Sequence, residues 1–334
     1  MQTLLDRALS NPLERNDARA LMQSLLAGEL AEDEMRMLLV GINARGFHAA
    51  EFAGFAEAMR AASVVLPFTT AEREELVDTC GTGGDSSGSF NISTAVALTA
   101  AACGVKIAKH GNRSVTSKCG SADVLEALGI PTSLPAEAAA EAIRTHNFAF
   151  LMAPIMHPAM KVVGPTRKAI GVRTVFNVLG PMTNPAGAAG QVMGVYSADL
   201  VPLVAEALAM LRVRHAMVVH GDGGLDELSL SGPSQVAVVR ECGYTIITIT
   251  PEDAGLQRAS LSELAGADAE ENAAILRTIF DGEKSPKRDI VLLNTAAVLL
   301  VAGLADDLRS GVQRAAEALD SGAVTRLVSL LATK

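Results

Sequence analysis

The chain has 334 residues, of which 49% are hydrophobic, and its formal net charge is −9. This length and composition suit one large α/β unit or two domains and argue against a disordered chain. The acidic balance argues against a protein that binds nucleic acid through a basic face, so anionic ligands must meet a local cluster of cations. The four cysteines, Cys80, Cys103, Cys119 and Cys242, lack C-x-x-C spacing. This pattern predicts reduced thiols rather than a zinc site.

The N-terminal residues lack the positively charged and then apolar pattern of a signal peptide. The most apolar helical run, residues 291–302, is shorter than the roughly 20 residues that a membrane span requires. We therefore expect a cytoplasmic protein that does not enter a membrane.

Residues 1–62 show helical periodicity throughout. Apolar side chains share one helical face at Met35, Leu38, Leu39 and Ile42, and again at Phe52, Phe55, Ala56 and Met59. Gly28 and Gly46 are typical of helix ends. Residues 61–74, which include Pro67, predict a linker between this helical part and the main domain.

Short strand candidates then alternate with helical stretches. The predicted strands are residues 76–79, 105–109, 148–153, 191–196 and 215–220. The predicted helices between them include residues 91–103, 121–128 and 200–212. This alternation predicts parallel βαβ units. Residues 235–250 predict edge strands with a turn at Gly243, and a closing helical layer is predicted over residues 260–265, 271–280, 289–302 and 306–319.

The segment after the first predicted strand is the most informative part of the chain. Residues 81–85 read Gly-Thr-Gly-Gly-Asp, and three glycines within four residues let backbone N–H groups approach a ligand that a Cβ would exclude. Asn91, Ser93 and Thr94 open a predicted helix, whose N-terminus favours the same anion. On spacing alone, the glycines equally suit a tight turn and Asn91 equally suits a simple N-cap.

Two further polar loops follow predicted strands. Lys109 and His110 end the second strand, and Asp226 and Glu227 follow a glycine-rich loop after residues 215–220. Ligands of α/β sheets bind outside the carboxyl ends of the strands, so we expect the three loops to converge. Adjacent carboxylates supply the oxygen ligands that Mg²⁺ prefers, although a solvated acidic turn is the simpler interpretation of Asp226 and Glu227 alone.

These motifs resemble the anthranilate phosphoribosyltransferase family of tryptophan biosynthesis. The resemblance covers nearly the whole chain and rests on residues 81–85, 91–94, 109–112, 121–129, 173–181, 183–186, 220–221 and 225–228. It implies an α/β fold of the nucleoside phosphorylase/phosphoribosyltransferase type. Residues 1–65 are expected to form a small helical domain, joined by later helices and used for dimerisation. Residues 75–334 are expected to form a larger α/β domain with a mostly parallel sheet.

The resemblance also implies a reaction. The phosphoribosyl group would move from 5-phosphoribosyl 1-pyrophosphate to anthranilate, giving N-(5-phosphoribosyl)anthranilate and pyrophosphate, the second step of tryptophan biosynthesis from chorismate. Mg²⁺ is the expected cofactor, with two ions, and a homodimer is the expected assembly. Catalysis would rest on positioning and on stabilising the departing pyrophosphate, so no catalytic side chain is assigned.

The resemblance assigns residues to each part of the site. The expected phosphoribosyl pyrophosphate contacts are Gly81, Gly83, Gly84, Asp85, Asn91, Ser93, Thr94, Lys109 and Cys119. The expected anthranilate contacts are Gly81, His110, Asn112, His157, Arg167 and Pro181. The expected metal ligands are Ser93, Asp226 and Glu227. Arg167 has the planar fork that a carboxylate favours, although an arginine on a helix surface is the simpler alternative.

One departure and two alternative functions remain. Met156 stands where many relatives carry tyrosine, which affects the expected acceptor pocket only. A pyrimidine nucleoside phosphorylase of the same architecture would carry an extra C-terminal domain. A non-enzymatic nucleic-acid-binding relative would have a basic surface and would lack the acidic pair. The presence of Arg167, Asp226 and Glu227 favours the transferase.

Overall fold

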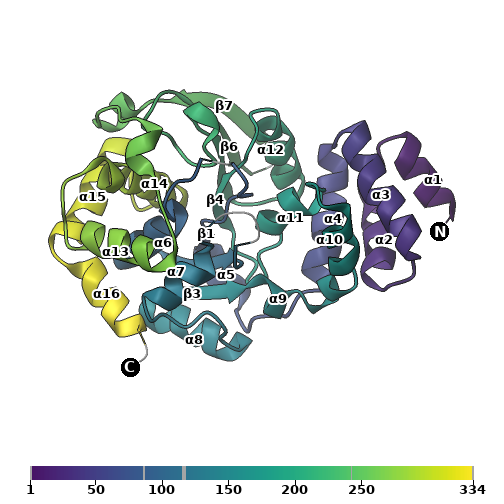
Figure 1. Cartoon of the computed structure of the whole chain (residues 1–334), viewed down its shortest axis with the longest axis horizontal. Coiled ribbons are helices and arrows are strands. Elements are labelled where there is room, and N and C mark those ends of the chain that lie inside the picture. Colours follow the sequence, from purple (N-terminus) through teal and green to yellow (C-terminus); the bar gives the residue numbers. More distant parts are fainter. Residues whose placement is uncertain (1, 86, 115–117, 242, 333–334) are drawn as a thin grey trace.

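The computed structural model describes residues 2–85, 87–114, 118–241 and 243–332. Cys242, named above among the cysteines, lies outside these residues. A central sheet has the N-terminal helices at one end of the molecule and the C-terminal helices at the other (Figure 1). Among the described residues, no helix combines the length and the apolar character that crossing a bilayer demands.

The sheet has seven strands in the order β3-β2-β1-β4-β5-β6-β7. Its five parallel strands are β1 (Leu76–Asp78), β2 (Lys106–Gly111), β3 (Phe148–Met152), β4 (Gly190–Gly194) and β5 (His215–His220). The antiparallel strands β6 (Ser234–Arg240) and β7 (Gly243–Ile249) complete one edge. The chain builds outward from β1 to β2 and β3, then returns to place β4 on the other side of β1. A ligand crevice is therefore expected at the carboxyl end of β1, where the strand order reverses.

The core on one side of the sheet is shared by helices from two separate parts of the chain. These helices are α1 (Gln2–Ser10), α2 (Arg15–Leu26), α3 (Glu32–Arg45), α4 (Ala49–Ala61), α10 (Gly164–Ile170), α11 (Phe176–Met182) and α12 (Leu200–Met210). Their apolar core is continuous from Phe52 of α4 through Leu179 of α11 to Val204 of α12, and it reaches Val218 of β5. The helical part therefore shares its core with one face of the sheet.

The other face packs against mainly C-terminal helices. They are α6 (Ile92–Ala102), α7 (Ser121–Ala127), α13 (Ala269–Phe280), α14 (Pro286–Ala302), α15 (Leu308–Asp320) and α16 (Ala323–Leu331). Leu98 of α6, Val298 of α14 and Val219 of β5 belong to this second core. A smaller third core lies between β2, β3 and α8 (Ala136–His146) and includes Ile143.

The fold class agrees with the sequence analysis, and the differences are local. The predicted linker over residues 61–74 contains the start of helix α5 (Thr70–Glu75), which begins with a capping box between Thr69 and Glu72. The helix predicted at residues 260–265 is a short 3₁₀ turn, η4 (Leu261–Leu264). Helix α9 (Ala153–Met156) and the turns η1 (Pro158–Lys161), η2 (Asp222–Gly224) and η3 (Pro251–Ala254) complete the elements.

Candidate active site

The segment Cys80 to Asp85, here called the glycine loop, follows β1 and is held by the neighbouring strand end. The Thr82 N–H donates to the Gly194 carbonyl at 2.9 Å, and the Gly83 N–H donates to Asp226 Oδ2 at 2.8 Å. A Cβ on Gly81 would stand 2.8 Å from the same carboxylate oxygen. A side chain at this position would displace the Asp226 carboxylate, so this loop and the acidic pair predicted from sequence meet directly.

Asp226 and Glu227, here called the acidic pair, are fixed by backbone contacts. A Cβ on Gly194 would stand 1.5 Å from the Asp226 carbonyl, so the end of β4 packs tightly on this segment. Asn294, buried in α14, accepts from the Leu228 N–H at 2.8 Å and donates to the Leu228 carbonyl at 2.9 Å. The pair therefore sits on a rigid support rather than on a solvated turn.

The electrostatics of the acidic pair favour a cation. Burial, with the nearby Asp85 carboxylate, raises the pKa of the Asp226 carboxyl to about 7. Burial and the Asp226 charge raise the pKa of Glu227 well above its usual value, against the opposing effects of Lys109 and the Ser93 N–H. Several carboxylates are thus crowded with too little positive charge. Their hard oxygen atoms fit Mg²⁺, because a divalent cation would relieve this repulsion.

Lys109 and His110 point to opposite sides of β2 because side chains alternate along a strand. The Lys109 ammonium is buried and donates to the Thr79 carbonyl at 3.1 Å and to Ser93 Oγ at 3.2 Å. The Ser93 N–H faces Glu227 closely enough to oppose the rise in the pKa of that carboxyl. The chain Lys109–Ser93–Glu227 links the second predicted loop, the start of α6 and the acidic pair.

On the other side of β2, His110 lies beside His157, with ring centroids 5.1 Å apart. His110 Nδ1 hydrogen-bonds to the Gly180 carbonyl at 3.1 Å. Within the described residues, the buried Nε2 atoms of both rings have no hydrogen-bond partner. Burial lowers the pKa of His110 to about 3 and that of His157 to about 4. Two neutral rings therefore present unused polar atoms in a dry setting.

Arg167 lies on α10, with its guanidinium carbon 5.0 Å from the centroid of the Phe176 ring. In the described part of the chain, this guanidinium forms no ion pair, and burial lowers its pKa. Arginine stays charged at neutral pH even so, which leaves a planar donor fork free for an anion. Pro181 lies inside α11, and its carbonyl accepts from Gln191 Nε2 at 2.6 Å.

Asn91 occupies the N-cap position of α6, but its side chain makes no capping hydrogen bond. Its Nδ2 donates to the Cys119 carbonyl at 3.2 Å, and its Oδ1 accepts from Asn272 Nδ2 at 2.9 Å. The hydrogen bond from Asn91 to the Cys119 carbonyl brings these two residues together at the start of α6. Thr94 lies in the first turn of α6, where its hydroxyl is fully buried.

The remaining sequence candidates lie further out. Asn112 is exposed, and its Oδ1 accepts from the Arg113 N–H at 2.8 Å. The Arg113 guanidinium forms ion pairs with Glu126 and Asp123 at the protein surface, so its charge is already compensated. Lys118, the other weaker cation candidate, is exposed.

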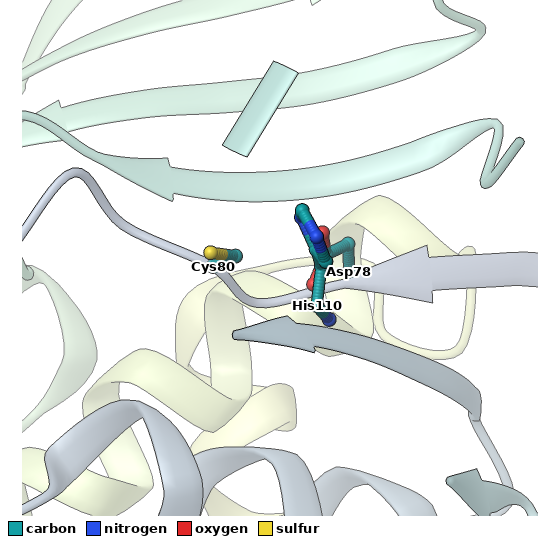
Figure 2. Close-up of side chains that lie close together, drawn as sticks. All are labelled: Asp78, Cys80 and His110. Carbon is teal, nitrogen blue, oxygen red and sulfur yellow. The ribbon is translucent and has the colours of Figure 1, made fainter. Parts of the chain in front are cut away.

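A second cluster of metal-ligand types lies at the base of the site, where ligand atoms of Asp78, Cys80 and His110 are within 4.8 Å of one another. Figure 2 shows the Cys80 sulfur on the side of its residue that faces away from the other two side chains. Asp78 Oδ1 accepts from the His110 N–H at 3.1 Å. Burial, with nearby carboxylates, raises the pKa of the Cys80 thiol far above its usual value, so this group is a poor metal ligand. Asp78 instead helps to join β1 to β2.

Sequence reasoning missed three residues that organise the site: Asn272, Asn294 and Arg173. Asn294 and Asn272 are buried polar residues within predicted helices, and a buried amide requires hydrogen-bond partners. This polarity was the available signal, but their partners lie far away in the chain. Arg173, which contacts the glycine loop through the Gly84 carbonyl, stands in a segment without regular structure.

Comparisons with known families divide the chain into two matched parts. Residues 73–325 match a family described as "Glycosyl transferase family, a/b domain". Residues 1–63 match a family described as "Glycosyl transferase family, helical bundle domain". Together, the two matches cover both the helical part and the sheet.

Curated proteins similar over nearly their whole length share one name. An anthranilate phosphoribosyltransferase of Moorella thermoacetica is 47% identical over 311 residues, which are 93% of this chain and 91% of that protein. One from Brevibacillus brevis is 48% identical over 318 residues, covering 95% and 92%.

Solved structures carry the same name. The Thermus thermophilus enzyme has a TM-score of 0.92 and 43% identity, with 98% of each chain covered. A Saccharomyces cerevisiae enzyme in complex with PRPP and Mg has a TM-score of 0.89 and 27% identity, covering 99% of this chain and 96% of that one. Another from yeast, in complex with 4-fluoroanthranilate, has a TM-score of 0.85 and 28% identity, covering 98% and 96%.

Proposed function

The chain belongs to the anthranilate phosphoribosyltransferase family, and from that premise we propose how its residues divide the work of the reaction. It is an enzyme of tryptophan biosynthesis that transfers the phosphoribosyl group of 5-phosphoribosyl 1-pyrophosphate to the amine of anthranilate. The products are N-(5-phosphoribosyl)anthranilate and pyrophosphate. The names of the relatives favour this reaction over a nucleoside phosphorylase or a nucleic-acid-binding relative.

The donor half comprises the glycine loop, the start of α6, Lys109 and Cys119, and we propose that it binds phosphoribosyl pyrophosphate. The N–H groups of Gly84 and Asp85 have no acceptor among the described residues. Together with the amino end of α6, they offer donors to the phosphate oxygens. The proposed contacts are Gly81, Gly83, Gly84, Asp85, Asn91, Ser93, Thr94, Lys109 and Cys119.

Ser93, Asp226 and Glu227 are the proposed ligands of Mg²⁺, with two ions in the working enzyme. The raised pKa values of both carboxyls support the proposal, because they report negative charge that lacks compensation. Bound Mg²⁺ would supply charge neutralisation for the pyrophosphate as it leaves. Lys109 holds Ser93 Oγ toward this cluster through the 3.2 Å hydrogen bond.

The acceptor half comprises Gly81, His110, Asn112, His157, Arg167 and Pro181, and we propose that it binds anthranilate. Arg167 would pair with the substrate carboxylate through its free fork. The neutral His110 and His157 rings would line the aromatic acceptor and hold its amine beside the donor half. Gly81 belongs to both halves because it stands next to the Asp226 carboxylate.

Catalysis in this scheme needs no protein nucleophile. The glycine loop stabilises charge on the departing pyrophosphate, and Arg167 holds the amine in line with the ribose carbon. The anthranilate amine is weakly basic, so its proton leaves late and a strong general base is unnecessary. The Cys80 thiol, which its raised pKa keeps protonated, takes no part.

The assembly and location are also proposed from the family premise. Residues 1–65, with later helices, would form the dimerisation domain, and residues 75–334 would form the catalytic α/β domain of a cytoplasmic homodimer. Exposed Met37 and Val40 on α3 support an apolar contact on that side. Sedimentation or light scattering tests this directly, and a monomer at micromolar concentration would contradict it.

The observation that carries the functional assignment is the hydrogen bond of the Gly83 N–H to Asp226, which joins the glycine loop to the acidic pair. The test mixes purified protein with anthranilate, phosphoribosyl pyrophosphate and MgCl₂ and follows the loss of anthranilate fluorescence. Loss that stops in the presence of a chelator is expected. Unchanged fluorescence with folded protein would contradict the assignment of the acceptor.

A further inference from the structure

Arg173 joins the two halves of the site, although it belongs to neither set of expected contacts. It follows α10, which ends at Gly171 in the left-handed conformation, and it precedes α11. Its guanidinium donates to the Gly84 carbonyl and lies over the Tyr196 ring, 4.2 Å from the centroid. An exposed side chain thus spans from the acceptor segment to the glycine loop.

Within the described residues, the other backbone groups of the glycine loop that hydrogen-bond to distant segments precede Gly84, whereas Asp85 is held through its side chain, which accepts from the Ser87 N–H at 3.2 Å. Thr82 and Gly83 are fixed through Gly194, Tyr196 and Asp226. Within the described residues, Arg173 provides the one hydrogen bond to the Gly84 carbonyl. Gly84 has a φ of 72°, a conformation open to glycine, and it has no side chain that would restrain this peptide.

The contact sets the direction of a donor. The described peptide bonds are trans, and in a trans peptide the carbonyl and the following N–H point in opposite directions. A Gly84 carbonyl held toward Arg173 therefore turns the Asp85 N–H away from Arg173. That N–H has no acceptor among the described residues, so it remains available for a ligand.

We propose that Arg173 is a positioning residue for the diphosphate group: it fixes the Gly84–Asp85 peptide, with the Tyr196 ring as its support, so that the Asp85 N–H faces the bound anion. The inference rests on the proposed donor half. Because Arg173 lies between Arg167 and Phe176 in sequence, it also ties the orientation of this peptide to the acceptor segment. A guanidinium suits this place because its flat fork stacks on a ring while it donates.

The test compares variants by calorimetric titration with inorganic pyrophosphate in MgCl₂ and by steady-state kinetics. Arg173→Ala is expected to weaken pyrophosphate binding and to raise KM for phosphoribosyl pyrophosphate about tenfold, with a smaller change in kcat. Arg173→Lys is expected to recover only part of this loss, because an ammonium lacks the fork and the flat stacking face. Lys168→Ala, which removes an exposed cation of the same segment, serves as the matched control and is expected to bind like wild type.

The support from Tyr196 separates positioning from direct contact with the anion. Tyr196→Phe is expected to bind pyrophosphate like wild type, whereas Tyr196→Leu is expected to weaken binding about threefold because the ring face is lost. If Arg173 touched the anion directly, Tyr196→Leu would bind like wild type, and the inference would be overturned. Equal losses in Arg173→Ala and Lys168→Ala would overturn it as well.

The same titration separates this inference from the proposed function. Wild type that binds pyrophosphate but leaves anthranilate fluorescence unchanged would contradict the acceptor assignment, while the tenfold difference for Arg173→Ala would still support positioning. If folded Arg173→Ala binds pyrophosphate with the affinity of wild type, the positioning role is contradicted even if the transfer reaction proceeds. Wild type that binds no Mg–pyrophosphate would overturn both.

Discussion

The two halves of the site satisfy their polar groups in opposite ways. In the donor half, the charged side chains are already paired with neighbouring groups, as in Asp226 with the Gly83 N–H and Lys109 with Ser93. In the acceptor half, the described neighbours of His110, His157 and Arg167 leave the Nε2 atoms and the guanidinium without hydrogen-bond partners. Strand β2 separates the two, with Lys109 facing one and His110 facing the other.

This difference indicates two modes of binding. A ligand of the donor half must exchange internal contacts for its own, and excess carboxylate charge makes that exchange depend on a cation. A ligand of the acceptor half would instead meet groups that have no internal partner among the described residues, so one charge and the fit to the neutral rings should decide affinity. Electrostatic variants should therefore act strongly on the donor half, whereas the acceptor half should respond mainly to loss of Arg167.

The largest expected effect comes from neutralising the acidic pair. In the double variant Asp226→Asn/Glu227→Gln, kcat/KM should fall about a thousandfold, or about 4 kcal/mol, because the proposed metal ligands and their charge are gone. The metal-free variant should also unfold at a higher temperature than wild type, since two crowded carboxylates no longer repel one another. Initial rates and thermal denaturation without metal measure the two effects.

Asp222→Asn is the control for the acidic pair because Asp222 lies in the same loop but accepts from Ser231 Oγ at 2.7 Å. It should retain most of its activity and its dependence on Mg²⁺. A double variant that kept full activity, or one that was less stable than wild type without metal, would show that the crowded charge has no functional use.

The next effect isolates the acceptor half. Arg167→Ala should raise KM for anthranilate about thirtyfold, or about 2 kcal/mol, because the carboxylate loses a charge-assisted fork. KM for phosphoribosyl pyrophosphate should stay within about twofold of wild type. Arg167→Lys should recover little, since an ammonium does not reproduce the paired geometry. A rise in KM for the donor instead would mean that the two halves have been divided wrongly.

The sequence predicted which loops form the site better than it predicted the hydrogen bonds between their residues. Regular alternation of strands and helices led to the parallel sheet, and loops that follow strands of such a sheet must meet at one edge. Helices α10 and α11 were not predicted, and Pro165 and Pro181 interrupt the helical pattern of that segment. Pro165 occupies the first turn of α10, where proline costs no hydrogen bond.

Residue partnerships were harder to predict because they join distant segments. Asn91 looked like a helix cap, yet its side chain bridges the Cys119 carbonyl and Asn272, 181 positions away in the chain. Asn294 braces the acidic pair from the middle of a buried helix. Periodicity places such residues inside the fold, but only the packed structure shows which backbone they hold. The assigned contacts with substrate stay predictions.

The third effect is the pH dependence of the donor half. The pKa of Asp226 is raised to about 7, so its carboxylate fraction falls as the pH drops from 8 to 6. A cation needs the ionised form, so Mg²⁺ should bind about tenfold more weakly at pH 6 than at pH 8. Titration of Mg²⁺ by calorimetry in the absence of substrates measures this, and Asp226→Asn is the control. Equal affinities at both pH values would place Asp226 outside the metal site.

The smallest expected effect concerns the acceptor half, where KM for anthranilate should not depend on pH. Burial lowers the pKa of His110 to about 3 and that of His157 to about 4, so both rings remain neutral throughout pH 6 to 8.5. With donor and Mg²⁺ saturating at each pH, KM for anthranilate should vary by less than about twofold. If either ring met the carboxylate as a cation, its pKa would rise on binding, and KM would fall steadily toward pH 6. A KM for anthranilate that is constant with pH, together with a Mg²⁺ affinity that changes with pH, would distinguish the two halves. The donor half would then recognise its ligand through carboxylates that titrate, and the acceptor half through Arg167 and neutral histidine rings.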